Sequence, residues 1–234
     1  MEYHQLIEND KLDGDSEVYK IKSSTYEIFS EAEDKPKKIS KFLIPLIKNK
    51  IILDFGCGTG KFIPQFAPLT KSYLAMDYSK SQLDIARKKA IKYNNVNFIE
   101  NTKDKIPLES SSVDIIIAVW VVGSIYNLEL RKKIIEEFKR VIKEEGSIYI
   151  VENNIGGEYK EIVDGNFGNE KTKFKLDWLE NNGFKKINSF KTYFEFENLE
   201  SAKKVFENIW DKEIASKINK KKISHNIVIY ENGK

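Results

Sequence analysis

The sequence predicts an α/β fold with a mostly parallel sheet that helices cover on both faces. Short runs of β-branched residues alternate with longer amphipathic stretches, which is the pattern of βαβ units. Most of the short runs are apolar at nearly every position, as expected of strands that are buried on both faces. The 234 residues are enough to form one large domain with a substantial core.

Seven runs are candidate strands, and helical patterns separate them. The strands are expected at residues 50–55, 72–77, 96–100, 113–120, 147–152, 186–196 and 226–230, and the helices at 81–93, 129–142, 173–182 and 200–218. The helix at 129–142 carries an apolar stripe with a period of about 3.6 residues, which predicts that one of its faces packs on the sheet.

The chain before the first strand has a different character. Residues 1–48 are polar and helical in pattern, and they predict an N-terminal helical cap ahead of a main domain at residues 49–234. Within that domain, the insert at about 153–169 contains four glycines, and we expect it to be mobile enough to act as a lid. The helix at about 200–218 is an addition to the domain.

Composition excludes several classes of protein. The 39 Lys and Arg residues against 36 Asp and Glu leave a formal charge of +3, too small and too dispersed for a nucleic-acid footprint. The single cysteine, Cys57, excludes an intramolecular disulfide and a cysteine-based zinc site. The longest apolar run covers only residues 115–122, whereas a membrane span needs about 20 residues. We expect a cytoplasmic protein without a membrane or nucleic-acid partner; the sequence does not indicate an oligomeric state.

The most informative segment is the glycine loop that follows the first strand. Asp54 and Phe55 end that strand, and Gly56, Gly58 and Gly60 follow at alternate positions. Glycines allow a tight turn and a close approach of the backbone to a ligand. The next strand ends on Asp77, where a carboxylate can accept both hydroxyls of a ribose.

A dinucleotide-binding loop would carry a glycine at position 61, which is Lys61 in this chain. The spacing Gly56-x-Gly58-x-Gly60 after Asp54 instead resembles motif I of the class I S-adenosylmethionine-dependent methyltransferases, and the resemblance extends over residues 51–152. It implies a Rossmann-like methyltransferase fold with seven strands in the order 3-2-1-4-5-7-6, the last hairpin being antiparallel. It also implies S-adenosyl-L-methionine as the cofactor and S-adenosyl-L-homocysteine as the product, with no metal.

The resemblance further implies which residues contact the cofactor. Tyr78 stands where family members pack a side chain on adenine, and Thr102 where an acid usually holds the adenine amino group. For Trp120 both core packing and pocket lining remain open. The implied cofactor-binding residues are Asp54, Phe55, Gly56, Cys57, Gly58, Gly60, Asp77, Tyr78, Thr102, Lys103, Trp120 and Tyr26.

Methyl transfer from a sulfonium is an in-line displacement, and it depends mainly on alignment, so that a general base is not required. The chain has only two histidines, His4 and His225, and we expect His225 to be structural or exposed. The sequence identifies no catalytic residue. Glu152, Asn153 and Tyr126 are candidates because they follow the fourth and fifth strands, near the expected acceptor pocket.

These features predict a methyltransferase that acts on an O, N or C nucleophile of a small molecule. Residues 118–121 lack the proline motif found in enzymes that methylate base nitrogens or glutamine amides. Enzymes that methylate C5 of pyrimidines need a cysteine nucleophile, and the only cysteine of this chain lies within the cofactor loop. Both classes are therefore disfavoured. Two alternatives remain open: a tRNA or protein acceptor, and a module that binds S-adenosylmethionine without catalysis. An aminopropyl transferase is disfavoured because residues 119–126 contain no acid.

Overall fold

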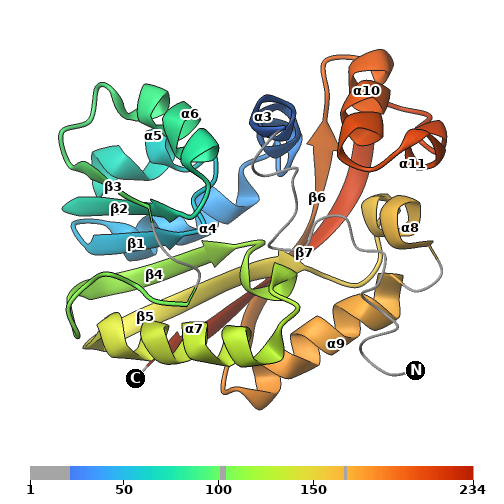
Figure 1. Ribbon diagram of the computed structural model, residues 1–234. Helices are drawn as coiled ribbons and strands as arrows, with labels where there is room; N and C mark the ends of the chain where they lie inside the picture. The colour runs from blue at the N-terminus through green and yellow to red at the C-terminus, as the bar shows by residue number, and fades with distance from the viewer. Residues whose placement is uncertain (1–21, 101–103, 166–167, 234) are drawn as a thin grey trace.

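The computed structural model describes residues 22–100, 104–165 and 168–233, and a seven-stranded sheet runs through this part of the chain (Figure 1). The strand order is β3-β2-β1-β4-β5-β7-β6, as predicted. β1 to β5 run parallel, whereas β7 is antiparallel to both β5 and β6. The strands are β1 Ile51–Phe55, β2 Ser72–Asp77, β3 Val96–Glu100, β4 Val113–Val119, β5 Ile142–Asn153, β6 Lys185–Glu195 and β7 Lys222–Gly233.

Helices cover both faces of the sheet. They are α3 Ser23–Ala32, α4 Lys38–Ile47, α5 Ile63–Phe66, η1 Ala67–Leu69, α6 Lys80–Ala90, η2 Val122–Ser124, α7 Leu128–Val141, α8 Glu158–Asp164, α9 Gly168–Asn181, α10 Leu199–Ile209 and α11 Lys212–Ser216. In Figure 1, α4, α5 and α6 lie above the sheet and α7 and α9 below it. Each layer has its own apolar core, and the two cores share the buried strands between them.

The N-terminal segment is anchored at the carboxyl end of the sheet by a third apolar core. Phe29 of α3 packs against Phe194 of β6, with ring centroids 4.9 Å apart, and against Trp210, with centroids 5.6 Å apart. Tyr159 of α8 joins the same cluster. As a result α3 lies beside α10 and above the ends of β4 and β5 (Figure 1), where ligands bind in sheets of this kind.

Several predicted elements differ from the structure: β7 begins at Lys222 rather than at residue 226, and α9 begins at Gly168 rather than at residue 173. Two further differences have a clear physical cause. The single helix expected at 200–218 is wrong, because the chain leaves the helix at Trp210 and Asp211 restarts it by accepting a hydrogen bond from Ile214 N at 2.9 Å. The fifth strand begins at Ile142 rather than at residue 147. Gly146 permits this early pairing with β4, since a Cβ there would lie 2.8 Å from the carbonyl oxygen of Asp114.

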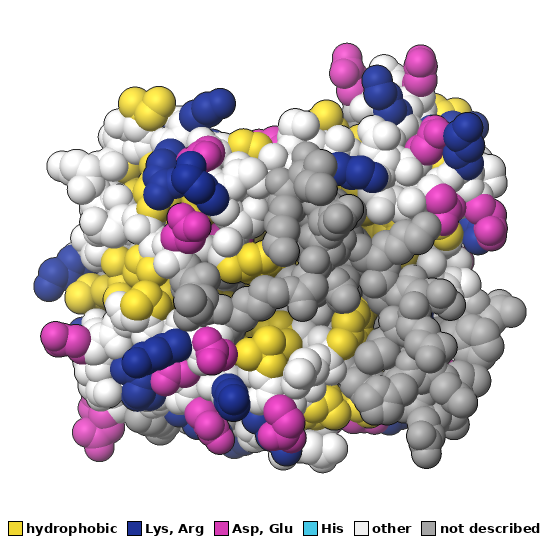
Figure 2. All heavy atoms as spheres, in the orientation of Figure 1, with side chains coloured by type: hydrophobic (Ala, Val, Ile, Leu, Met, Phe, Trp, Pro, Cys, Tyr) yellow, Lys and Arg dark blue, Asp and Glu magenta, His cyan; other side chains and the backbone are white. Residues whose placement is uncertain are grey.

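The predicted insert at 153–169 begins at the last residue of β5 and contains α8. Charged side chains of both signs are mixed over the upper and lower helices of the face in Figure 2, with hydrophobic side chains gathered between them. Over the described ranges, no helix combines the length and the apolar character that a bilayer span requires.

Candidate active site

The glycine loop leaves the end of β1 in a conformation that only glycines adopt readily. Gly56, Gly58 and Gly60 have φ angles of +71°, +55° and +76°. A Cβ at Gly56 would lie 2.4 Å from Val121 Cγ2, so this turn also requires glycine for steric reasons. Cys57 N donates to the carbonyl oxygen of Met76 at 2.9 Å, which holds the loop against the end of β2.

Asp77, the last residue of β2, lies directly beside the loop. Its Oδ2 accepts from Gly58 N at 2.9 Å and its Oδ1 from Ser79 N at 2.8 Å. Each carboxylate oxygen has a further lone pair with which to accept a ligand hydroxyl. Burial raises the pKa of Asp77 to about 6, although the backbone N–H groups oppose the shift, and the side chain is therefore mostly ionised at pH 7.

The last two residues of β1 and Cys57 in the loop are more deeply buried than their predicted contact with the cofactor suggests. Asp54 is 2% exposed, and its Oδ2 accepts a hydrogen bond from the hydroxyl of Tyr73. Burial raises the pKa of Asp54 to about 7. The ring of Phe55 packs edge-on against Phe138 in the core. Burial also raises the pKa of the Cys57 thiol, as expected of a buried side chain rather than a reactive thiolate.

Two other predicted cofactor residues lie near the loop. Tyr78 follows Asp77 and is half-buried. Tyr26 on α3 reaches the loop, since its Cε1 would lie 3.9 Å from a Cβ at Gly58. Thr102 and Lys103 lie outside the described residues, as does His4.

A pocket lies beside the loop, between α3, the ends of β4 and β5, α8 and α9. Its volume is about 50 Å³, several times the roughly 10–15 Å³ that one water needs. Aromatic, acidic and basic side chains all line it. They are Tyr26, Phe29, Glu33, Trp120, Ser124, Tyr126, Asn153, Tyr159, Lys160, Val163, Asp164 and Lys175.

Trp120 lines this pocket in an unusual backbone conformation. Its φ is +57°, a left-handed value that side-chain-bearing residues rarely adopt. Its indole Nε1 is buried and has no hydrogen-bond partner among the residues that the structure describes. Strained residues and unpaired buried polar groups are both typical of ligand sites.

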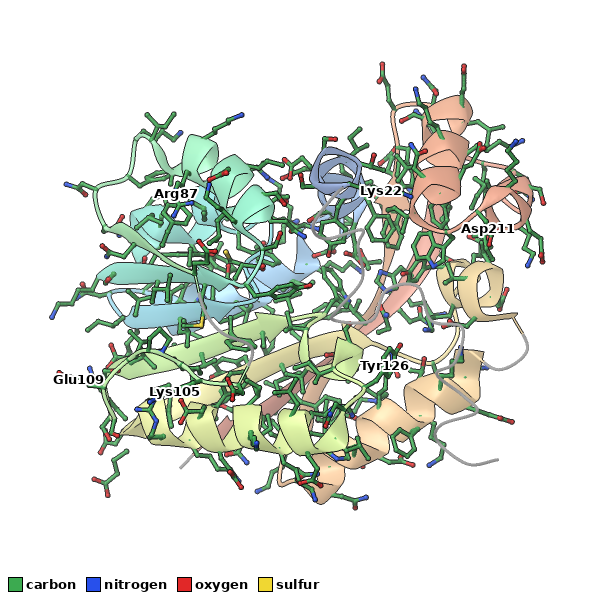
Figure 3. All side chains as sticks on the ribbon, in the orientation of Figure 1. Lys22, Arg87, Lys105, Glu109, Tyr126 and Asp211 are labelled. Carbon is green, nitrogen blue, oxygen red and sulfur yellow. The ribbon has the colours of Figure 1, made fainter. Side chains whose placement is uncertain are left out.

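The three catalytic candidates separate in the structure. Asn153 and Tyr126 line the pocket, and Lys175 Nζ lies 3.2 Å from the hydroxyl of Tyr126 (Figure 3 labels Tyr126). Glu152 does not line the pocket: it is 4% exposed and accepts from Gly123 N at 2.7 Å. A Cβ at Gly123 would lie 2.6 Å from Glu152 Oε2, which fits the glycine at that position.

The sequence did not indicate a role for two charged residues, Glu33 in the pocket and the half-buried Lys61 beside it. Glu33, just after α3, is 5% exposed, and burial raises its pKa to about 8. Lys61 donates through Nζ to the carbonyl oxygens of Ser30, at 2.6 Å, and of Glu33, and lies 5.3 Å from the centroid of the Trp120 ring. The position of Lys61 directly after Gly60 could have indicated a role at the site, whereas nothing in the local sequence pattern marks Glu33.

His225 is fully buried, so the exposed alternative is excluded. Its Nε2 lies 2.6 Å from Asn153 Oδ1 and its Nδ1 lies 3.5 Å from Glu33 Oε1. Burial lowers the pKa of His225 to about 3, and the nearby Lys160 and Lys61 add to the shift. The imidazole is therefore neutral near pH 7.

Comparison with known proteins gives consistent results. Residues 53–150 match the family model Methyltransf_11, described as a methyltransferase domain. The ubiquinone/menaquinone biosynthesis C-methyltransferase UbiE of Campylobacter jejuni is 33% identical over 114 residues, which are 46% of this chain and 46% of that protein. The chain thus spans less than half the length of this curated relative.

Solved structures share the fold at low sequence identity. A structure of YcgJ from Bacillus subtilis has a TM-score of 0.62 at 15% identity, covering 83% of this chain and 97% of that one. A SAM-dependent methyltransferase from Aquifex aeolicus has a TM-score of 0.57 at 19% identity, covering 99% and 98%.

The strand order and the glycine loop define the class: this is a class I methyltransferase fold. The match of residues 53–150 is more particular, because the part of the sheet that carries the glycine loop is similar to the Methyltransf_11 methyltransferase domain, although the match covers less than half of the chain.

Proposed function

We propose that the protein is an S-adenosylmethionine-dependent methyltransferase whose acceptor is a small molecule bound in the pocket beside the glycine loop. The observation that carries this proposal is that the glycine loop and the pocket lie next to each other. Tyr26 both approaches Gly58 and lines the pocket, so that a ligand on the loop and a molecule in the pocket would be neighbours.

The described residues fit the cofactor. The glycines leave no Cβ between the loop and a ligand, and Asp77 keeps lone pairs for the ribose hydroxyls. Tyr78 follows Asp77, where we expect the adenine to bind, and Trp120 and Tyr26 line the pocket. The cofactor supplies a methyl carbon already activated by a sulfonium. The task of these side chains is to hold donor and acceptor in line, which can supply several kcal/mol of the barrier.

The small volume of the pocket, about 50 Å³, favours a small acceptor over tRNA or protein. Relatives do not fix the atom methylated, since they include a C-methyltransferase and, at 26% identity, a phosphoethanolamine N-methyltransferase of Triticum aestivum. Within the described residues, no group of three or more His, Cys, Asp or Glu side chains is arranged to hold a metal. A cytoplasmic location stays a prediction from the sequence.

Titration calorimetry tests the cofactor assignment. We expect S-adenosylmethionine and S-adenosylhomocysteine to bind in the micromolar range and NAD not to bind. At a hundred times its dissociation constant, S-adenosylhomocysteine should stabilise the protein by about 2.7 kcal/mol, which for a chain of this length raises Tm by about 5 °C or more. Equal binding of NAD, or no binding of either adenosyl ligand, would contradict the proposal.

A second measurement separates an enzyme from a binding module. Formation of S-adenosylhomocysteine is followed by mass spectrometry over a panel of small acceptors, with bulk tRNA as a comparison. Turnover with a small acceptor supports the proposal. Binding of the cofactor without turnover on any acceptor favours the module, and turnover only on tRNA, with a steep salt dependence, favours the macromolecular alternative.

A further inference from the structure

Three polar side chains from distant segments meet beside the pocket. Glu33 follows α3, Asn153 ends β5, and His225 lies on β7. Glu33 Oε1 lies 3.5 Å from His225 Nδ1, and His225 Nε2 lies 2.6 Å from Asn153 Oδ1. Glu33 and Asn153 line the pocket, and the imidazole lies between them.

The contacts of His225 determine where its proton lies. Asn153 Oδ1 can only accept, so Nε2 carries the hydrogen and the lone pair of Nδ1 faces Glu33. The ring is held between Trp120 and Phe194, whose centroids lie 5.9 Å and 5.0 Å away. His225 is therefore a neutral, fixed group that positions the Glu33 carboxyl.

Among the described residues, no ion pair joins the Glu33 carboxyl to a Lys or Arg side chain. The ammonium of Lys61 donates instead to the carbonyl oxygens of Ser30 and of Glu33 itself. Lys61 lowers the pKa of Glu33, but burial and the carboxyls of Asp34 and Glu152 raise it, to about 8 overall. At pH 7 the carboxyl therefore keeps its proton until a positive charge enters the pocket.

Aromatic rings surround the same space. Tyr26, Phe29, Trp120 and Tyr159 line the pocket together with Glu33. The faces of such rings attract a cation, most strongly where water is excluded. An aromatic wall with a buried carboxyl suits a protonated amine better than a neutral or anionic group.

Ammonium groups also line the pocket, and they limit the charge of the ligand. Lys160 is paired with Asp164, and Lys175 Nζ lies 4.9 Å from the centroid of the Tyr126 ring. These ammonium groups disfavour a second positive charge on the bound molecule. The pocket is therefore suited to a small molecule with one amino group.

We propose that the acceptor is a small primary or secondary amine and that Glu33 is the residue that binds it and removes its proton. This inference rests on the proposed function. Binding of the ammonium ionises Glu33, whose proton leaves to solvent. One proton then passes from the amine nitrogen to a carboxylate oxygen of Glu33, which frees the nitrogen lone pair. The nitrogen forms its bond to the methyl carbon as the carbon–sulfur bond breaks, and the electron pair of that bond stays on sulfur.

The raised pKa of Glu33 suits this role. A carboxyl at its ordinary pKa is a poor base for an ammonium group, and a value near the working pH is the effective range for proton transfer. His225 and Asn153 do not take the proton and act as positioning residues.

The test measures amine binding directly, because the natural acceptor is not identified. Benzylamine and ethanolamine are titrated at pH 7 into the protein with and without S-adenosylhomocysteine, and their neutral counterparts benzyl alcohol and ethylene glycol serve as comparisons. Titrations in phosphate and in HEPES, which differ in ionisation enthalpy, give the number of protons released. We expect at least one amine to bind tenfold or more tightly than its neutral counterpart, with close to one proton released per bound amine.

Glu33→Gln should remove both the preference for the amine and the proton release. The matched control is Glu31→Gln on the same helix, which should change neither, since Lys89 keeps its other partner, Glu27, at 2.7 Å. The proton count in the wild-type protein needs no variant, and it remains decisive if Glu33→Gln does not fold.

Three results would overturn the inference: no binding of either amine, equal binding of the neutral counterparts, or unchanged amine binding and proton release in Glu33→Gln. The separate titrations with amines and with S-adenosylhomocysteine also distinguish a failure of this inference from a failure of the proposed function. Binding of S-adenosylhomocysteine without amine binding overturns only the amine assignment. Amine binding by a protein that does not bind S-adenosylhomocysteine contradicts the proposed function and keeps the amine site.

Discussion

At the scale of single residues, Asp77 holds the glycine loop, and we also propose that it binds the ribose of the cofactor. The sequence predicts a carboxylate for the ribose hydroxyls. In the structure the same carboxylate also accepts from Gly58 N and Ser79 N, and so it joins the glycine loop to the start of α6. Asp77 therefore holds the glycine loop in its conformation before the cofactor binds.

We expect Asp77→Ala to weaken the binding of S-adenosylmethionine at least tenfold, or about 1.4 kcal/mol. The substitution removes the ribose acceptor and frees the Gly58 and Ser79 N–H groups. Calorimetry measures the affinity, and circular dichroism checks that the fold is retained. Asp84→Ala, at an exposed acid on α6, is the control and should bind as the wild type does. An unchanged affinity of Asp77→Ala would remove Asp77 from the cofactor site.

At the scale of elements, Lys61 connects the glycine loop to α3. Its ammonium binds carbonyl oxygens at the end of that helix and also lies over Trp120. The aromatic cluster around Phe29 holds the other side of α3. The N-terminal helix is thus part of the wall between the loop and the pocket.

We expect Lys61→Met to loosen α3. Without the ammonium, the carbonyl oxygens of Ser30 and Glu33 lose their donor, and local opening of residues 23–33 becomes easier. Amide hydrogen exchange there should be faster by about tenfold, while exchange in β1 and β4 changes little. Lys71→Met, at an exposed lysine before β2, is the matched control. Unchanged protection of residues 23–33 in Lys61→Met would show that the Phe29 cluster alone holds the helix.

The limits of the helices and strands show which parts of the secondary structure local sequence patterns can predict. β2 and β3 have the predicted limits, because apolar runs between turn residues define a buried strand. The break between α10 and α11 was missed since the apolar stripe continues across it, whereas Asp211 caps the second helix. The early start of β5 was missed because it depends on the space above Gly146, which is set by β4.

At the scale of the whole molecule, buried carboxyls should make stability depend on pH. Burial raises the pKa of Glu33 to about 8, of Asp54 to about 7 and of Asp77 to about 6. In the unfolded chain these groups lose their protons near pH 4 to 4.5, so above that pH the native state binds more protons. Its stability therefore falls as pH rises through each native pKa. His225, with a lowered pKa, acts in the opposite direction below about pH 6.5.

The window from pH 6.5 to 8 isolates the carboxyls, and mainly Glu33. We expect the free energy of unfolding of the wild type to fall there by about 2 kcal/mol, measured by urea denaturation. Glu33→Gln cannot ionise and should show a much smaller fall. Asp84→Asn, at an exposed carboxyl, should follow the wild type. Parallel curves for Glu33→Gln and the wild type would mean that the Glu33 carboxyl is already ionised in the native protein.

The sequence by itself determined the positions of the buried strands, the glycine loop and the acid at the end of β2, whereas the strand order was implied by the resemblance to class I methyltransferases. These features depend on neighbours in the chain: apolar runs define buried strands, and glycines at alternate positions define the turn. The same signals were sufficient for the class I methyltransferase resemblance.

Only the tertiary structure decided what stands around the pocket. Glu33, Asn153 and His225 are separated by 120 and 72 positions in the chain and meet because α3, β5 and β7 converge at the carboxyl end of the sheet. Asn153 was a candidate because of its place after the fifth strand, whereas no local pattern marks Glu33 or indicates that these three side chains meet. Their burial, their charges and their partners are properties of the packed molecule, because they are set by the side chains that exclude water around them.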